Sequence, residues 1–417
     1  MNRDPDVLIV GGGPAGASAA FRLASAGIRV RLLERSRFPR DKPCAECLSP
    51  QASRILQEMD VLGELEPRGV WLRGMIVRAP NGMIAHGDYA GAHGYRALRD
   101  GGLAIRRDLL DVALLRRACE AGAETMEGSR AVDVVRDRAG RVGGVRVLRR
   151  DGATIDQHAR FVIGADGLRS LVARRLRLAR SFAWPRRISL VGHYRRIADM
   201  TEYVEMHVER DGFVGIADVG LGVTTVAAVF PIARAPEISG DRAGFLERWL
   251  ASKPQLRGRF RDAIRDGGVA AIGPFASHAR RASVPGALLV GDAADFFDPF
   301  TGEGIYAALR GGELAAAALF DALGAPARED AALAEYDAVR RREFRGKWVV
   351  EKLIGAGVSF PPIVNRAVRA LAGSKDMADL LVGVTGDFVP ASEVLRPAYL
   401  ARLFLTPVPK TQPAAWR

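Results

Sequence analysis

Cysteine is scarce in this chain, and its scarcity excludes a fold built on disulfides. Cys44, Cys47 and Cys119 are the three cysteines, too few for a disulfide framework, which agrees with a reducing compartment. Cys44 and Cys47 form a C-x-x-C pair, but no second pair completes a zinc site. The six histidines show no metal-ligand spacing. We therefore expect no metal centre.

Long hydrophobic runs are missing as well. Leu314–Phe320 is among the longest apolar stretches, and it is too short to cross a bilayer. At the amino terminus, Asp4 and Asp6 stand where a basic leader would be, and an apolar strand pattern begins at once. We therefore expect a cytoplasmic protein.

Lysine is rare, although the chain is strongly basic. Six lysines stand beside 55 arginines, and the formal net charge is +13. The arginines are scattered, and aromatic residues that would stack on bases are not interleaved with them. We expect no nucleic-acid partner. The charge suits an anionic nicotinamide substrate, or a membrane surface that holds a lipid-like substrate, at least as well.

The chain does contain a nucleotide-binding pattern at its start. Val7–Val10 is an apolar strand that leads into Gly11–Gly13. Ala15–Ala26 shows a small-residue helical pattern, Gly27 stands at its end, and Val30–Leu33 predicts a second strand. These residues predict a βαβ unit of about thirty residues.

The glycines of this unit fit a dinucleotide fingerprint. Gly11, Gly13 and Gly16 match G-x-G-x-x-G between a strand and a helix. They allow a tight turn, a close approach of the backbone to a pyrophosphate, and close packing of helix on strand. The phosphates would then lie at the helix amino terminus. Glu34 ends the second strand, where a carboxylate can accept hydrogen bonds from ribose hydroxyls.

Two later motifs separate FAD from NAD. One stretch reads Gly164-Ala165-Asp166-Gly167-Leu168-Arg169-Ser170, and another runs from Gly291-Asp292-Ala293-Ala294 through Pro299 to Gly302-Glu303-Gly304. With these motifs in this order, the chain resembles the flavin-dependent aromatic hydroxylases over nearly its whole length. The resemblance implies that FAD is the cofactor.

The resemblance also assigns roles to individual residues. It implies that Asp292 hydrogen-bonds the ribityl chain, that Asp166 lies beside the pyrophosphate, and that Arg107 in an R-x-x-L-D segment contacts the diphosphate or ribityl region. The helix that starts at Gly302–Gly304 would direct its positive end at the flavin. The residues expected to bind FAD are Gly11, Gly13, Pro14, Ala15, Gly16, Glu34, Arg35, Arg107, Asp166, Gly167, Gly291, Asp292, Pro299, Gly302 and Gly304.

The expected fold is α/β. We predict a Rossmann-type FAD-binding domain with a glutathione-reductase-like βαβ unit, an inserted β-sheet substrate domain and C-terminal helices. The FAD-binding domain would comprise residues 1–175 and return over 279–330. The β-rich substrate domain would span 176–278, joined by the segment 66–100, and the C-terminal helical region would span 331–417.

A further segment bears on the branch of the family. Arg40–Pro50 resembles the K-x-C-G-x-x-L segment of geranylgeranyl reductases, and Thr301–Tyr306 resembles both that branch and the flavin-dependent halogenases. Two features depart from this pattern. Ala45 replaces a glycine, and Gly212–Asp218 lacks the reductase Y-x-W-x-F-P motif. The halogenase W-x-W-x-I-P motif is missing too, and no lysine lies in a recognisable halogenase motif.

Several reactions fit these motifs. The preferred prediction is a monooxygenase that uses NADPH or NADH and molecular oxygen to hydroxylate a hydrophobic aromatic or polyketide-like compound through a flavin C4a-hydroperoxide. The alternatives are reduction of isoprenoid double bonds, halogenation, and a structural flavoprotein without catalysis. No second nucleotide fold is present, so the nicotinamide cofactor would bind only transiently. The sequence does not indicate the oligomeric state.

Candidate catalytic and substrate-binding residues complete the prediction. Glu46 or His193 could be a general base, although an exposed acid and a packed histidine are the simpler interpretations. Cys44 could donate a proton in a reductase, be a small buried thiol, or form a redox pair with Cys47. The Trp348–Val364 region could cap the cavity, contact a membrane, or pack as an ordinary helical layer. Substrate contacts are expected from Cys47, Tyr194, Phe213, Phe230 and Phe300.

Overall fold

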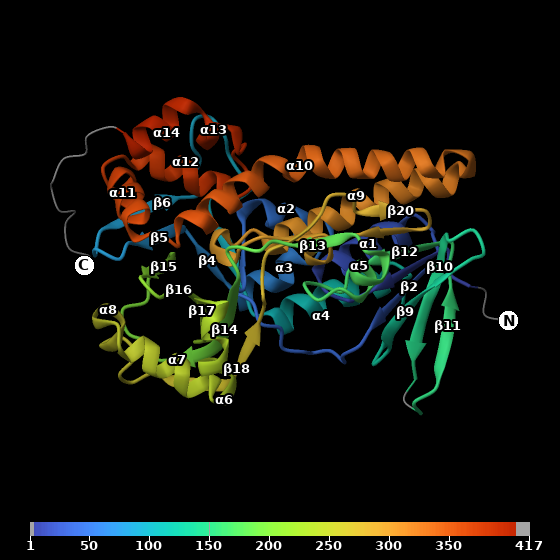
Figure 1. Ribbon diagram of the computed structural model, residues 1–417, viewed down its shortest axis with the longest axis horizontal. Coiled ribbons are helices and arrows are strands. Elements are labelled where there is room, and N and C mark those ends of the chain that lie inside the picture. Colours follow the sequence, from blue (N-terminus) through green and yellow to red (C-terminus); the bar gives the residue numbers. More distant parts are fainter. Residues whose placement is uncertain (1–3, 150, 406–417) are drawn as a thin grey trace.

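The computed structural model describes residues 4–149 and 151–405. A six-stranded sheet of order β20-β21-β12-β1-β2-β8 forms the first layer, parallel except for its edge strand β20 (Figure 1). Its strands are β20 Ser283–Val284, β21 Ala287–Leu289, β12 Phe161–Gly164, β1 Val7–Val10, β2 Val30–Glu34 and β8 Glu124–Glu127. Strands from three distant parts of the chain therefore build one nucleotide-binding sheet. The fold is α/β with a Rossmann-type FAD-binding domain, as predicted.

Helices with small residues cover this sheet. Helix α1 (Pro14–Ser25) packs on the long helix α9 (Gly304–Gly324). The Ser18 hydroxyl donates to the Leu309 carbonyl at 2.8 Å. A Cβ at Gly312 would lie 2.6 Å from the Ala15 carbonyl oxygen. The alanine and glycine pattern therefore lets the two backbones approach closely.

A seven-stranded sheet of order β18-β14-β17-β16-β15-β5-β6 forms the second layer. All its neighbours are antiparallel except β15 and β5. Its strands are β18 Ile264–Ile272, β14 Arg187–Arg195, β17 Thr224–Pro231, β16 Gly212–Asp218, β15 Val204–Glu209, β5 Gly74–Arg78 and β6 Ile84–Asp88. Strands from residues 74–88 and from residues 187–272 thus share one sheet.

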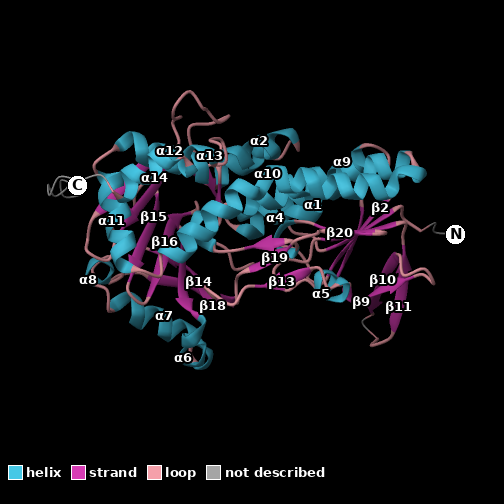
Figure 2. Ribbon diagram, turned by 45° about the horizontal axis from the view of Figure 1, so that its top comes forward, coloured by secondary structure: helices cyan, strands magenta, loops and turns pink. Residues whose placement is uncertain are grey.

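The two faces of this second sheet have different covers. One face packs on α6–α8, whose bounds are Ala235–Gly240, Arg242–Ala251 and Pro254–Arg257. The other face looks toward the FAD-binding domain and the C-terminal helices (Figure 2). Those helices are α11 Pro361–Ala372, α12 Lys375–Thr385, α13 Ser392–Leu395 and α14 Pro397–Phe404. Helix α10 (Glu329–Gly357) spans from α9 to this C-terminal group (Figure 1).

Smaller elements complete the chain. Three three-stranded sheets are β11-β10-β9, β13-β19-β22 and β3-β7-β4. Their bounds are β9 Arg130–Arg136, β10 Val142–Leu148, β11 Thr154–His158, β13 Ala179–Ser181, β19 Ser277–Ala279, β22 Asp295–Phe296, β3 Cys47–Leu48, β7 Gly102–Ala104 and β4 Val70–Leu72. The remaining α-helices are α2 Pro50–Glu58, α3 Leu62–Leu65, α4 Arg107–Glu120 and α5 Leu171–Leu176. Residues 406–417, placed by the sequence in the C-terminal helical region, lie outside the described residues.

Candidate flavin and substrate site

The glycine-rich loop after β1 is built for a close backbone approach. Gly11 has a φ of +106°, which favours glycine. A Cβ on Gly11 would overlap the Ala165 carbonyl oxygen, and one on Gly16 would overlap the Gly11 carbonyl oxygen. The loop after β1 therefore packs directly against the loop after β12, and side chains at Gly11 and Gly16 would not fit.

Gly13 has a different surrounding. A Cβ there would meet only the guanidinium ends of Arg40, at 3.7 Å, and Arg107, at 4.0 Å. Gly13 is also the N-cap of α1, and no side chain caps that helix end. Free N–H groups and two guanidinium groups thus face one spot, where an anionic diphosphate fits.

Lys42 adds a third cation, one that the motif analysis did not single out. The Lys42 Nζ lies 3.3 Å from the position that a Cβ on Gly167 would occupy. Lys42 therefore lies between the first glycine loop, Gly11–Gly16, and the second, which contains Gly167, and it lines the cavity. Burial, with the nearby Arg107 charge, lowers the pKa of Lys42, while the Asp292 carboxylate opposes that shift. The lysine of the K-x-C segment was the available sequence signal.

Glu34 is held rigidly at the end of β2. Its carboxylate accepts hydrogen bonds from the Gly12 N–H at 2.9 Å and the Ser36 N–H at 2.8 Å. Arg40 Nη2 lies 3.9 Å from it. The carboxylate is therefore fixed beside the glycine loop, as binding of a ribose requires. Arg35, expected to join it, is exposed at the surface.

Asp166 is both a helix cap and an incomplete hydrogen-bonding group. Its Oδ2 accepts from the N–H of Leu171 at 2.6 Å and of Val172 at 3.3 Å, which fixes the start of α5. Its Oδ1 is buried without a hydrogen-bond partner among the described residues. Burial raises the pKa of Asp166. An additional donor, such as one from a bound cofactor, would satisfy Oδ1.

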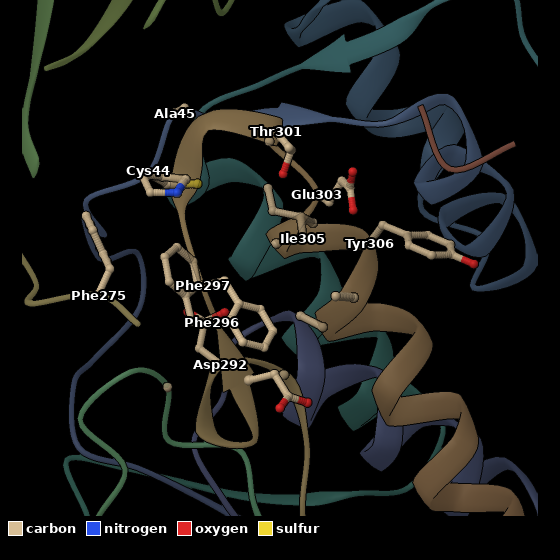
Figure 3. A pocket seen from close by; sticks show the side chains of 18 of the residues that line it. Cys44, Ala45, Phe275, Asp292, Phe296, Phe297, Thr301, Glu303, Ile305 and Tyr306 are labelled. Carbon is tan, nitrogen blue, oxygen red and sulfur yellow. The ribbon is translucent and has the colours of Figure 1, made fainter. Parts of the chain in front are cut away.

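Asp292 follows β21 and lines the same cavity. It belongs to the 3₁₀ turn Gly291–Ala293, below the start of α9 in Figure 3. Burial raises its pKa, against the opposing charges of Lys42 and Arg107. A ligand group that donates a hydrogen bond to Asp292 would offset the free-energy cost of burying its carboxylate. The ribityl hydroxyls of FAD fit that chemistry.

The third glycine loop, Gly302–Gly304, lies at the start of α9, and this end of the helix faces the cavity. Gly302 has a φ of +74°, and a Cβ there would meet nothing within 4 Å. Glu303 is the N-cap of α9, and its side chain makes no capping hydrogen bond. The free N–H groups of this 21-residue helix therefore remain available to an electron-rich ring edge. Gly302, Gly304 and Pro299 all line the cavity.

Glu46 occupies the opposite side of the site in an unusual conformation. It is a non-glycine residue with a φ of +62° and is almost fully buried. Its Oε1 accepts from the Arg107 N–H at 2.8 Å, and its Oε2 lies 2.7 Å from His193 Nε2. Its own N–H approaches Cys44 Sγ at 3.3 Å. The exposed-acid interpretation of Glu46 is therefore wrong.

Ion pairs and hydrogen bonds hold the other polar side chains on the Glu46 side of the cavity. Arg107 forms a bidentate pair with Asp111, both N–O distances being 2.9 Å, and also hydrogen-bonds Cys44. Burial lowers the pKa of His193, but the hydrogen bond to Glu46 and the Glu46 charge act together against burial, and the net shift is upward. Burial raises the pKa of the Cys47 thiol. Cys44 contacts a guanidinium and an N–H, whereas the Cys47 thiol donates to the Ala45 carbonyl at 3.2 Å.

Apolar strand residues form the far wall of the cavity. Strand alternation turns Val191, Phe213 and Val229 toward it, with Ser189 and Met206 beside them. The cavity volume is about 200 Å³. It therefore joins the three glycine loops to a hydrophobic sheet face.

Two expected substrate contacts are corrected by that alternation. Tyr194 packs on Phe260, and Phe230 packs on Phe245 and Trp249, all beneath α6–α8. Because neighbouring residues of a strand point to opposite faces, Tyr194 and Phe230 point away from the cavity. Hydrophobicity alone did not reveal which face each residue occupied.

The other candidates lie close to the cavity. Cys44, Glu46, Cys47 and Phe213 line it. His193 shares the cavity-side parity of β14 but stands behind Glu46 rather than in the wall. Phe300 packs edge-on against Phe213, with ring centroids 5.1 Å apart, and lines a smaller adjoining pocket of about 40 Å³.

Known proteins agree with this geometry. Residues 4–350 match the family model described as FAD binding domain. The chain belongs to that family. It is an FAD-dependent oxidoreductase, and the glycine loops, Glu34 and the open Asp166 and Asp292 carboxyls fit FAD.

Three relatives illustrate the range of that family. The chain is 31% identical to the digeranylgeranylglycerophospholipid reductase 2 of Methanopyrus kandleri over 92% of this chain and 93% of the relative. It is 30% identical to the menaquinone reductase of Mycolicibacterium smegmatis over 76% of each. The solved structure of a myxobacterial chondrochloren halogenase superposes with a TM-score of 0.77 at 24% identity, covering 85% of this chain and 83% of that one. The last likeness concerns the fold.

Residues 4–149 and 151–405 show neither a metal-binding cluster nor a membrane-spanning helix. No group of three or more His, Cys, Asp or Glu side chains is arranged to hold a metal ion. No helix in those ranges has the length and apolar character needed to span a bilayer.

Proposed function

We propose that this protein reduces carbon–carbon double bonds in the isoprenoid chain of a lipid or quinone, with electrons from NADPH or NADH. The observation that carries the proposal is the cavity itself: a hydrophobic sheet face and the Gly302–Gly304 loop line the same cavity. The names of the two reductase relatives support the same reaction class.

The reduction needs one hydride and one proton. FAD, when bound, would supply hydride-transfer chemistry. A hydride adds to one carbon of the double bond, and a proton adds to the other, so the protein must provide an acid. Cys44 is our candidate, because Arg107 and the Glu46 N–H stabilise the thiolate that remains after proton loss. The Glu46–His193 pair lies next to that sulfur and could return the proton.

Departures from the reductase pattern bear on the substrate. Phe213, Gly215 and Ala217 alternate on β16 where the reductase motif carries aromatic residues, and Phe213 and Gly215 line the cavity. Gly215 and Ala217 leave more space than aromatic side chains would. We therefore expect a substrate bulkier near the reacting carbons than a bare isoprenoid chain, such as a prenylated ring.

Hydroxylation of a phenolic compound is the second candidate. The buried Glu46–His193 pair favours it, because a carboxylate coupled to an imidazole can remove a phenolic proton. The two reactions differ in their need for oxygen. A monooxygenase incorporates an oxygen atom, and a reductase works without oxygen.

We also propose contact with an anionic membrane surface at one end of the cavity. The segment before β14, helix α10 and the start of α11 carry exposed apolar side chains, namely Phe182, Trp184, Val349, Leu353, Phe360 and Ile363. The rings of Trp184 and Phe360 lie 5.9 Å apart. Phe182 packs on Phe297, which lines the cavity, so the exposed patch adjoins the site.

Charge supports this surface. Exposed Lys352 and Arg345 lie on the same helix as Val349 and Leu353, and exposed Arg186 lies two residues after Trp184. Aromatic and aliphatic residues with basic neighbours are typical of peripheral membrane contacts. We expect binding to vesicles with anionic lipid and weaker binding by a Trp184→Ala, Leu353→Ala variant. A protein that stays in the soluble fraction in flotation would contradict this contact.

The proposed reaction can be tested on the flavin itself. The holoprotein is reduced anaerobically, mixed with a prenylated lipid or quinone, and followed by the return of oxidised flavin absorbance. We expect return with substrate, slowed at least about tenfold in Cys44→Ser, an effect within the range of general acid catalysis. Cys119→Ser, at an exposed cysteine, is the matched control. Equal rates for the two variants would exclude Cys44 as the acid.

A further inference from the structure

Behind the third glycine loop, Gly302–Gly304, lies a group of buried and half-buried ionisable residues that the proposed reaction does not use. Glu303 belongs to the loop, and Lys347 and Glu351 are one turn apart on α10; all three line the cavity. The Glu303 side chain is 3% exposed, and both its carboxyl oxygens are buried without a hydrogen-bond partner among the described residues. Figure 3 shows Glu303 on the Tyr306 side of the loop, away from Cys44.

The charges of this group do not balance. Lys347 forms an ion pair with the buried carboxylate of Asp387 and also lies over the Tyr306 ring, 4.2 Å from its centre. One ammonium group thus faces three carboxyl groups. Because burying unpaired carboxylates is costly, Glu303 and Glu351 together must keep a proton.

The neighbouring charged groups do not correct the imbalance. On α9 and α10, Arg310 pairs with Glu343, which also accepts from the Tyr306 hydroxyl. Toward the cavity, the charges are paired as Asp295 with Arg340 and His278, and Asp298 with Arg187. The Tyr89 phenol also lies near Glu303. Each cation nearby therefore already has an acidic partner.

We propose that Glu303 and Glu351, with Lys347, form a proton-holding site that binds one further proton when negative charge develops beside the Gly302–Gly304 loop and releases it when that charge is removed. Only an O–H bond forms and breaks, and the proton comes from solvent. The inference rests on the proposed function insofar as reduction of the cofactor creates that charge.

The titration of the pair lies in a suitable range. Burial raises the pKa of Glu303 to about 7, although the Lys347 charge opposes this. Burial and the Glu303 charge raise the pKa of Glu351 well above its usual value. Burial lowers the pKa of Lys347, and the charges of Glu303, Glu343 and Glu351 partly offset that shift. Near neutral pH the pair can therefore both take up and release a proton.

The cofactor-free protein allows a test that does not depend on any reaction. Difference infrared spectra recorded across about pH 6 to 8 should show the carbonyl stretch of a protonated carboxyl disappear as the pH rises through the pKa of the pair. We expect this band to be altered in Glu303→Gln and in Glu351→Gln. Glu335→Gln, at an exposed acid of the same helix, should leave it unchanged. Absence of the band in the wild type would overturn the proposal.

Redox coupling is tested on the holoprotein. Protons taken up from a weakly buffered solution near neutral pH are counted with an indicator dye while the flavin is photoreduced without oxygen. Glu303→Gln and Glu351→Gln should each take up fewer protons per flavin than wild type and Glu335→Gln. Equal uptake would contradict the coupling. A normal proton signal without substrate reduction would instead contradict the proposed function alone.

Discussion

Glu46 Oε2 and His193 Nε2 lie 2.7 Å apart, and the two residues come from segments 147 positions apart in the sequence. The pair couples the loop before β3 to strand β14 of the second sheet. Since Glu46 also accepts from the Arg107 N–H at 2.8 Å, one carboxylate connects the cofactor side of the cavity to its hydrophobic wall.

This pair should stabilise the fold in acid more than in base. The hydrogen bond to Glu46 raises the pKa of His193 above its unfolded value. A raised histidine pKa stabilises the folded state below the unfolded pKa, and the benefit is lost as pH rises through the folded pKa. His193→Gln should therefore cost about 1–3 kcal/mol at about pH 5.5 and less at about pH 9, measured by denaturant unfolding. His158→Gln, at an exposed histidine, should show no such difference between the two pH values.

Asp292→Ala should yield protein that is colourless or poorly loaded with flavin. The substitution removes the carboxylate expected to hold the ribityl chain and leaves Lys42 and Arg107 without its opposing charge. Flavin absorbance relative to protein absorbance measures the loss, expected to exceed about tenfold in affinity, as for a charged hydrogen bond. Asp321→Ala, at an exposed position of α9, should be fully yellow. Full loading of Asp292→Ala would mean that Asp292 is not a cofactor ligand.

Gly16→Ala should prevent both flavin binding and correct folding. A Cβ there would overlap the Gly11 carbonyl oxygen, and neither backbone can move without separating α1 from β1. We expect little soluble, flavin-loaded protein. Gly63→Ala places its methyl group in open space on α3 and should fold normally, with a small gain in helix propensity. A yellow, stable Gly16→Ala protein would contradict the close approach of the two loops.

The sequence predicted the cofactor site more fully than the substrate site. Gly11, Glu34 and Asp292 lie in short motifs whose spacing follows from the geometry of a strand, a turn and a helix. Their convergence at one edge of a parallel sheet follows from the fold. Most of the residues predicted to bind the cofactor therefore come from short local motifs.

The substrate wall depends on which way each strand faces. Phe213 and Phe230 are equally hydrophobic, but only the first faces the cavity, because both faces of the second sheet are buried and residue type does not distinguish them. Lys347 and Asp387 come from distant segments, and their ion pair follows from helix packing that has no short-range signature. Tertiary packing decides these features.

Glu303→Gln should change how stability depends on pH. Burial raises the pKa of Glu303 from 4.5 in the unfolded chain to about 7, so between these values the folded protein holds a proton that the unfolded chain lacks. Wild-type stability should therefore fall by up to about 3 kcal/mol as pH rises through this window. The glutamine variant lacks this titration and should fall less. Denaturant unfolding at about pH 5 and pH 8 measures the difference, and parallel losses in both proteins would contradict the buried proton.

The most direct test of the account is the mass of the product formed without oxygen. The holoprotein is incubated anaerobically with NADPH or NADH and prenylated lipids or quinones, and the products are analysed by mass spectrometry. The account predicts a product heavier by one pair of hydrogen atoms, formed equally well with and without oxygen. A product that requires oxygen and gains one oxygen atom would contradict double-bond reduction and support hydroxylation instead.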